Sequence, residues 1–361
     1  MLSQNSIPTR TPQATDLVIG THELIAELQE RLNAGESFDN PKLREIADQS
    51  FGGSRARGRY TSRDAYDALE IAVNKYLDGQ ARQLMRMDVS EALVSVLRPL
   101  MKRLARQCDR TLEQTELQQF STPPTLAYLA ARILNPQSND IVLEPSAGTG
   151  SLAIWPRSIG AQVICNEINP RRYALLTQEA RFETHQLDAE IIDDLLPAEI
   201  QPTAVLMNPP FSATGGRVAK HSAHYGARHI ESALRRLQQG GRLVAITGEG
   251  MRFQVSAFSE LWQRIAKTYN VRANLHLSGN EYGKYGTTFD LQILVIDKIG
   301  ETPGDNWTEQ LKNIVWSDAA TIEEAWTALS GIAERPETAT DQNETAEEGT
   351  KLYLSLTHPP S

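Results

Sequence analysis

An apolar run at residues 204–207 stops at Asn208, Pro209, Pro210 and Phe211. Proline has no N–H to donate to a neighbouring strand, so two consecutive prolines end a strand and leave carbonyl groups facing whatever lies beyond it. The amide oxygen and an exposed carbonyl can accept hydrogen bonds from an NH2 group, and the ring can stack on a planar molecule. The motif therefore predicts a site for a planar ligand with an exocyclic amine. The other interpretation is a strand-ending turn with an incidental aromatic.

A second group of residues predicts a nucleoside site. The apolar run 141–143 leads into a loop with Gly148 and Gly150, and such glycines let the backbone approach a ligand closely. Glu167 ends the next apolar run, where an acid can accept hydrogen bonds from both hydroxyls of a ribose. The sequence has no Gly-Lys-Ser/Thr phosphate motif and the loop lacks a third glycine, so we expect a nucleoside without phosphates rather than ATP or NAD.

Taken in order, three motifs resemble those of the amino-methyltransferases that make N6-methyladenine in DNA: Gln-Phe-Ser-Thr-Pro-Pro at 119–124, Glu-Pro-Ser-Ala-Gly-Thr-Gly at 144–150, and Asn-Pro-Pro-Phe at 208–211. The resemblance spans residues 119–297. Longer runs are similar to the methyltransferase modules associated with strawberry-notch-type helicases, although no helicase motif follows; these runs are 208–212, 232–237, 240–248 and 285–287.

This resemblance implies S-adenosylmethionine as cofactor and DNA as partner, with a helicase or another protein as a further partner. It implies that Thr122 contacts the methionine carboxylate, Glu144 the ammonium group, Glu167 the ribose and Asp188 the adenine amino group. Asp193 or Asp194 could take the place of Asp188. The full set of implied cofactor contacts is Phe120, Thr122, Glu144, Ser146, Gly148, Gly150, Glu167, Asp188 and Asn208.

At the reaction centre the motif 208–211 suits methyl transfer to an amine. If the Asn208 oxygen and the Pro209 carbonyl both accept its N–H groups, the nitrogen lone pair can attack the methyl in line, and no general base is needed beforehand. Phe211 would stack on a base extruded from the helix, and Tyr285 or Tyr282 could close the other face. RNA, cytosine N4 and protein glutamine are alternative substrates. A silent cofactor-binding accessory protein is the alternative from another class.

Two basic loops could hold phosphate groups. The first, at 52–60, contains Arg55, Arg57 and Arg59, and a solvated turn is its other interpretation. The second follows Phe211 and contains Arg217 and Lys220, and a mobile lid is the competing interpretation there.

The charge distribution permits a nucleic-acid partner. The formal net charge is −9, and residues 301–361, with 12 Asp and Glu against 3 Lys and Arg, account for all of it. Residues 51–110 carry 12 Lys and Arg against 7 Asp and Glu, which allows a local basic face.

The elements that position these residues form an α/β protein. Short apolar runs alternate with helical patterns from residue 141, which predicts a mostly parallel, Rossmann-like sheet with its ligand site at the carboxyl ends of the strands. The resemblance identifies this as a class I methyltransferase sheet behind an N-terminal helical domain. We expect a flexible lead at 1–15, a helical domain at 16–118, the methyltransferase domain at 119–300, a helical extension at 301–333 and an acidic, disordered tail at 334–361.

The composition is that of a globular protein of 361 residues. No export signal and no apolar stretch long enough to span a membrane is present, so we expect a cytoplasmic protein. Cys108 and Cys165 form no zinc or disulfide pattern, and we expect no metal. Orphan regulation, restriction partnership and protection of a phage or plasmid all stay open.

Overall fold

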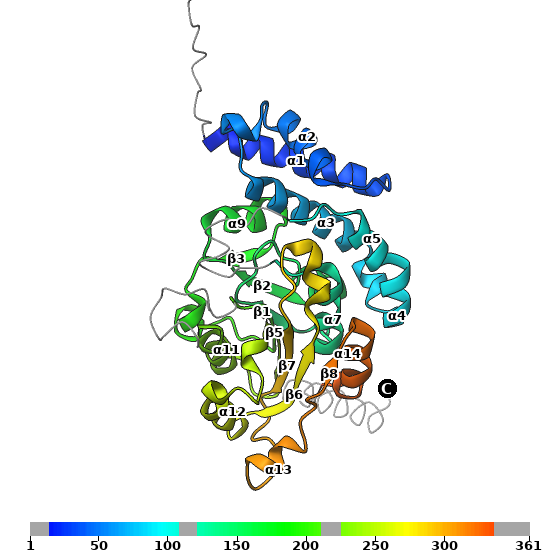
Figure 1. The fold of residues 1–361 in the computed structure, drawn as a ribbon. Coiled ribbons are helices and arrows are strands. Elements are labelled where there is room, and N and C mark those ends of the chain that lie inside the picture. The colour runs from blue at the N-terminus through cyan, green and yellow to red at the C-terminus, as the bar shows by residue number, and fades with distance from the viewer. Residues whose placement is uncertain (1–13, 108–120, 211–224, 336–361) are drawn as a thin grey trace, which may run out of the picture.

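A computed structural model describes residues 14–107, 121–210 and 225–335 (Figure 1). It contains an N-terminal group of helices followed by an α/β domain, as predicted. The strands and glycine loop of the cofactor motifs lie in the α/β domain, below the helices in the view of Figure 1.

Three helices open the chain: α1 at Ala14–Asn33, α2 at Asn40–Ser50 and α3 at Ser62–Leu84. A capping box begins α3, because Thr61 accepts from the backbone of Asp64 while the Asp64 carboxylate accepts from the backbone of Thr61. Leu69, Val73 and Leu77 are buried along this helix, as their spacing predicts.

A second helical stretch covers α4 at Val89–Ala92, η2 at Leu93–Leu97 and α5 at Arg98–Arg103. The wide π turn η2 comes directly before Pro99, whose ring cannot lie against the carbonyl four residues earlier in a regular α-helix. Pro99 is therefore accommodated by a local widening of the helix.

The sheet has eight strands in the order β3-β2-β1-β4-β5-β7-β6-β8. Only β7 runs antiparallel to its neighbours β5 and β6. The strands are β1 Ile141–Glu144, β2 Gln162–Asn166, β3 Glu183–His185, β4 Ala204–Met207, β5 Arg242–Gly248, β6 Asn270–Leu277, β7 Leu291–Asp297 and β8 Asp318–Ala319. The predicted α/β, Rossmann-like fold is confirmed, and this topology is that of a class I methyltransferase sheet.

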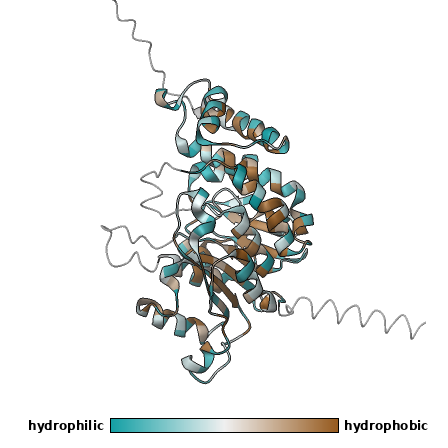
Figure 2. Ribbon diagram, turned by 45° about the vertical axis from the view of Figure 1, so that its right-hand side comes forward, coloured by the Kyte–Doolittle hydropathy of each residue, from teal (hydrophilic) through white to brown (hydrophobic). Residues whose placement is uncertain are grey.

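Alternate residues of each central strand enter cores on opposite faces of the sheet, as Leu206 and Val205 of β4 do. Helices α7 (Pro124–Leu134), α8 (Ile154–Ile159) and α14 (Ile322–Leu329) cover one face with α3. Helices α10 (Ile192–Leu195), α11 (Tyr225–Arg236) and α12 (Ser259–Ala266) cover the other. Figure 2 shows the resulting apolar interior and polar outer surface.

The remaining short elements are α9 (Pro170–Ala174), α13 (Trp307–Leu311), η1 (Arg55–Arg57), η3 (Leu175–Glu179), η4 (Ala189–Ile191), η6 (Glu249–Met251), η7 (Ser256–Phe258), η8 (Gly279–Tyr285) and η9 (Ser330–Ile332). In the segment predicted as a helical extension, 301–333, α14 and η9 form the last helical stretch, with Thr321 as the N-cap of α14. Strand β8, which has only two residues, was not predicted from the sequence. It leaves β6 one position from the edge of the sheet.

Candidate functional site

The planar amide of Asn208 lies directly after β4 and is held by two hydroxyl groups. Its Nδ2 donates to Thr122 Oγ1 at 2.9 Å and to the Tyr282 hydroxyl at 3.0 Å. Both N–H groups of the amide are thus used, which fixes the orientation of the amide plane. Thr122, predicted from the 119–124 motif, therefore lies in the same site as Asn208, as the order of motifs implies.

The two tyrosines predicted to face the substrate are both buried. Tyr282 is 0 % exposed and Tyr285 is 6 % exposed, and both belong to η8, between β6 and β7. Tyr282 meets the motif through its hydroxyl, and burial raises the pKa of that hydroxyl above its ordinary value. This placement favours a positioning role for Tyr282 over stacking against a base.

Two acids occupy the ends of β1 and β2, where the sequence predicts them. Glu167 accepts from the backbone of Gly148 through Oε2 at 2.8 Å and from Asn169 through Oε1 at 2.8 Å. These bonds fix the carboxylate beside the glycine loop.

Glu144 is 2 % exposed, and its Oε2 has no hydrogen-bond partner among the described residues. Burial first, and then the negative charge of Glu167, raise the pKa of Glu144 well above its ordinary value. An unsatisfied buried carboxylate oxygen is costly, and a bound cation would relieve that cost. The observation fits the ammonium group that the resemblance assigns to this residue.

Gly148 and Gly150 both have positive φ angles, +58° and +85°. A side chain at Gly150 would also meet Leu176 and Phe182 at 3.1 Å, so the turn itself favours glycine at this position. Ser146 lies in the same loop, with its hydroxyl 3.5 Å from Nδ1 of His229 on α11.

Helix α3 packs its polar face onto this loop, which the sequence analysis did not predict. Glu70 accepts from the hydroxyl of Thr149 at 2.9 Å, and Asn74 donates to the Thr149 carbonyl at 2.9 Å. One turn towards the N-terminus of α3, Asp67 lies 2.9 Å from a guanidinium nitrogen of Arg63 and 2.9 Å from one of Arg171. The helical domain therefore forms part of the wall around the glycine loop.

The structure places Asp188 after β3, where it is exposed and caps η4 by accepting from Glu190. Of the two alternatives, Asp193 is engaged by Ser232 and by Arg235 of α11. Two exposed aliphatic side chains lie nearby in sequence, Ile168 beside Glu167 and Ile191 in η4, at 54 % and 45 % exposure. The sequence did not single out these two isoleucines, because exposure depends on tertiary packing.

Of the predicted phosphate contacts, the structure describes only the first loop. Arg59 donates to the Phe51 carbonyl and Arg55 to Ser62, while Tyr60 stacks on Phe51 with ring centroids 4.8 Å apart. Arg57 is exposed. The other predicted residues Phe120, Phe211, Arg217 and Lys220 lie outside the described residues.

One group of side chains at the same edge of the sheet has the composition of a cation site: Glu249, His276 and Asp290. Nε2 of His276 lies 3.3 Å from Asp290, and Nδ1 lies 3.0 Å from Asp318. Carboxylates therefore flank the imidazole ring on both sides.

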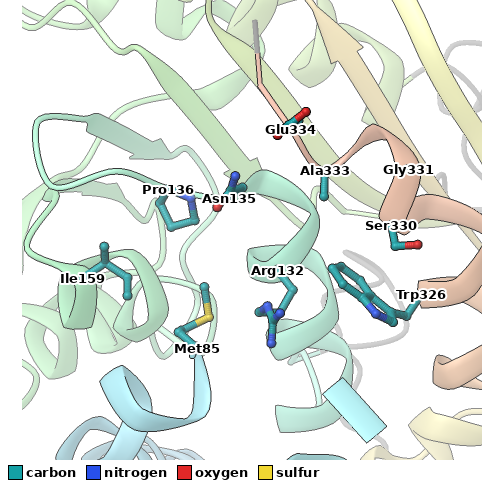
Figure 3. Close-up of a pocket in the computed structure, with 10 residues that line it drawn as sticks. All are labelled: Met85, Arg132, Asn135, Pro136, Ile159, Trp326, Ser330, Gly331, Ala333 and Glu334. Atoms are coloured by element: carbon teal, nitrogen blue, oxygen red, sulfur yellow. The ribbon is translucent and has the colours of Figure 1, made fainter. Parts of the chain in front are cut away.

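A cavity of about 470 Å³ lies at the opposite end of α7 from Thr122, between that helix and the C-terminal segment (Figure 3). In it, Arg132 stacks on Trp326 with its guanidinium 5.1 Å from the ring centroid. Asn135, the C-cap of α7, borders the cavity. The cavity therefore lies far from the strand ends that carry the cofactor motifs.

None of the helices in the described ranges has the length and apolar character that a membrane crossing requires. A comparison with curated proteins gives no match. A comparison with solved structures gives similarities at low identity.

The methyltransferase subunit of a type I restriction-modification system from Streptococcus thermophilus is 17 % identical, with 86 % of this chain and 74 % of that chain covered and a TM-score of 0.46. The M protein of the type I restriction enzyme EcoKI is 15 % identical, with 81 % and 68 % covered and a TM-score of 0.42. A candidate RNA methyltransferase from Pyrococcus horikoshii is 18 % identical, with 61 % and 99 % covered and a TM-score of 0.41.

The family model of the methyltransferase small domain matches residues 127–271. This range contains β1 to β5 and with them Glu144, the glycine loop, Glu167 and Asn208. Over these residues the chain is therefore similar to the methyltransferase small domain, and its sheet has the topology of a class I methyltransferase.

Proposed function

We propose that the protein transfers a methyl group from S-adenosylmethionine to the exocyclic N6 of adenine in DNA. The observation that carries the proposal is the amide of Asn208, fixed by Thr122 and Tyr282 at the end of β4, in the same domain as the unsatisfied carboxylate of Glu144. In-line attack by an amine requires a hydrogen-bond acceptor of fixed orientation. A turn that only ends a strand does not require such an acceptor.

The cofactor would be held by groups whose chemistry matches its parts. Glu144 would pair with its ammonium group and Glu167 would accept from its ribose, while Ile168 offers an apolar surface to its adenine. When bound, S-adenosylmethionine supplies an electrophilic methyl group. Asp188 stays a weaker candidate for the adenine amino group, because its side chain already caps η4.

The protein's own contribution to the reaction is to orient the target nitrogen. Asn208 Oδ1 and the Pro209 carbonyl would accept its two N–H groups and turn the lone pair towards the methyl group. The proton leaves the nitrogen after transfer, so the motif needs no basic side chain. Phe211 is proposed to stack on the flipped base.

The deciding experiment incubates the protein with radiolabelled S-adenosylmethionine and duplex DNA, single-stranded DNA, RNA or protein. We expect label in DNA at N6-methyladenine, with transfer reduced at least about 100-fold by Asn208→Ala. Label at cytosine N4, in RNA or in protein would reassign the substrate. Label in none of them, with cofactor binding retained, would favour a silent binding protein, and transfer that survives Asn208→Ala would refute the mechanism.

The domain match and the fold apply equally to several substrates, so the choice of DNA adenine rests on the order and content of the three motifs. The resemblance to modules associated with strawberry-notch-type helicases stays a prediction. A pull-down with the purified full-length chain as bait would test for a helicase partner.

A further inference from the structure

A groove with an excess of positive charge lies between the end of α5 and η8. Two neighbouring hollows of about 460 and 490 Å³ form it, and Lys102, Arg106 and Lys284 line both. We call it the basic groove. Lys42 borders it at one end and Arg98 at the other, and the carboxylates that line it are Asp39 and Glu281.

The cations at the two ends of the basic groove pair with carboxylates, and those in its middle do not. Arg98 pairs with Glu323, and Lys42 lies 3.1 Å from Glu45. Within the described ranges Lys102, Arg106 and Lys284 form no ion pair with a carboxylate. Lys284 donates to the Leu104 carbonyl at 2.8 Å, and a carbonyl leaves its charge uncompensated.

Both acids that line the groove are engaged by the protein itself. Asp39 caps α2 by accepting from the backbone of Lys42, and Glu281 accepts from the Thr125 hydroxyl at 2.6 Å. The unpaired positive charge in the middle of the groove is therefore the feature that a mobile anion would meet.

The basic groove adjoins the catalytic motif on both of its walls. Lys284 lies two residues after Tyr282 in η8, and Thr125 lies three residues after Thr122. Tyr282 and Thr122 are the two groups that hold Asn208. Any chain bound in the groove would thus lie next to the segments that orient the amine acceptor.

We propose that the basic groove binds the phosphodiester backbone of DNA beside the target base. This inference rests on the proposed function. Lysine and arginine contacts to phosphates release counterions, so affinity falls with salt in proportion to the number of phosphates neutralised. Such contacts fix the position of the strand and carry no sequence preference of their own.

The test compares two double variants with the wild-type chain. Lys102→Ala with Arg106→Ala removes the two exposed cations of the groove, and Arg82→Ala with Lys267→Ala removes two exposed cations elsewhere. Lys284 is kept, because its bond to Leu104 joins η8 to the helical domain. DNA affinity is measured by fluorescence anisotropy over a range of salt concentrations, together with cofactor affinity by calorimetry.

For the groove variant we expect at least about tenfold weaker DNA binding at low salt and a slope of log K against log salt that is shallower by about 1.8, since two phosphate contacts are lost. Cofactor affinity should stay unchanged, and the control variant should bind as the wild-type chain does. An unchanged salt slope in the groove variant overturns the inference, as does a loss confined to RNA. A wild-type chain that binds DNA through the groove but methylates no base would refute the proposed function alone.

Discussion

Asn208 depends on hydroxyl groups from two segments that are distant in sequence, and Tyr282 supplies one of them. Tyr282→Phe removes this acceptor and leaves the buried ring in place. A hydrogen bond of this kind contributes about 0.5 to 1.5 kcal/mol, so we expect kcat to fall by about 3- to 10-fold with the cofactor Kd unchanged. Steady-state kinetics of methyl transfer check this.

Tyr269→Phe is the matched control, because that tyrosine lies beside Asn270, at the other end of β6 from η8. If Tyr282→Phe and Tyr269→Phe have the same kcat as the wild-type chain, Tyr282 does not position the amide.

The buried carboxyl group of Glu144 leads us to predict that cofactor affinity depends on pH. Burial and Glu167 raise its pKa in the free protein, whereas an ammonium group requires the ionised carboxylate. Below that raised pKa, cofactor binding must expel a proton, so affinity should rise as pH increases towards the pKa. Calorimetry in two buffers with different ionisation enthalpies should detect proton release on binding at pH values between the ordinary pKa of a glutamate and this raised pKa.

Glu144→Gln should abolish this proton release, and Glu183→Gln, at the exposed edge of the sheet, should keep it. Equal proton release in both variants would place the titrating group elsewhere.

The sequence predicts these residues to different degrees. Asn208, Glu144 and Glu167 could be found because each ends an apolar run, and strand ends of a parallel sheet meet at one edge. The contact of the Tyr282 hydroxyl with Asn208 could not be predicted, because the two residues lie 74 positions apart and a tyrosine before a strand can have many roles. Exposure, which singles out Ile168, depends on packing that a single strand does not specify.

At the scale of elements, α3 connects the helical domain to the glycine loop. The side-chain amide of Gln107 donates to Glu70 at 2.6 Å, and Glu70 is the acid that binds the loop. The backbone N–H of Gln107 donates to the Lys284 carbonyl at 2.7 Å. Glu70 in turn accepts from Thr149. A continuous set of hydrogen bonds therefore joins the basic groove to the cofactor loop through the helical domain.

Asn74 tests the importance of this contact. Asn74→Ala removes a buried donor and leaves the Thr149 carbonyl without it, so we expect a loss of about 1 to 3 kcal/mol in the free energy of unfolding, with weaker cofactor binding. Urea denaturation and calorimetry measure the two effects.

Asn313 also donates from its side chain to a carbonyl, that of Pro303, but at the surface. Asn313→Ala should cost less than about 0.5 kcal/mol. Equal losses of unfolding free energy in the two variants would show that the contact of α3 with the loop does not stabilise the fold more than a surface hydrogen bond does.

The capping box and the apolar spacing of α3 are visible in the sequence, but the contacts of its polar face are not. A helix face with Arg63, Asp67 and Glu70 normally faces solvent. Here that face is buried against the loop and α9, where Arg171 pairs with Asp67 and the hydroxyl of Thr149 donates to Glu70. This partnership between distant segments is a tertiary property that local periodicity does not contain.

At the scale of the whole molecule, hydrogen bonds and an ion pair attach residues 332–335 to the sheet and to the loop before it. Arg242 of β5 is fully buried, pairs with Asp297 at 2.7 Å and donates to the carbonyls of Ile332 and Glu334. Arg335 pairs with Asp140. The described fold thus extends two residues beyond the boundary predicted at 333, into the predicted acidic tail.

This anchor separates two truncations that look similar in sequence. Deleting residues 336–361 removes Glu337, Asp341, Glu344, Glu347 and Glu348 against Lys351, and leaves the anchor intact. We expect unchanged unfolding free energy and tighter DNA binding at low salt, with the difference disappearing as salt screens the charges. Deleting residues 330–361 also removes the carbonyls that Arg242 binds and leaves its buried donors unsatisfied, so it should lower stability by several kcal/mol. Weaker DNA binding by the shorter deletion would mean that the acidic segment takes part in recognition, and equal stability of the two truncated chains would mean that the anchor does not hold the sheet.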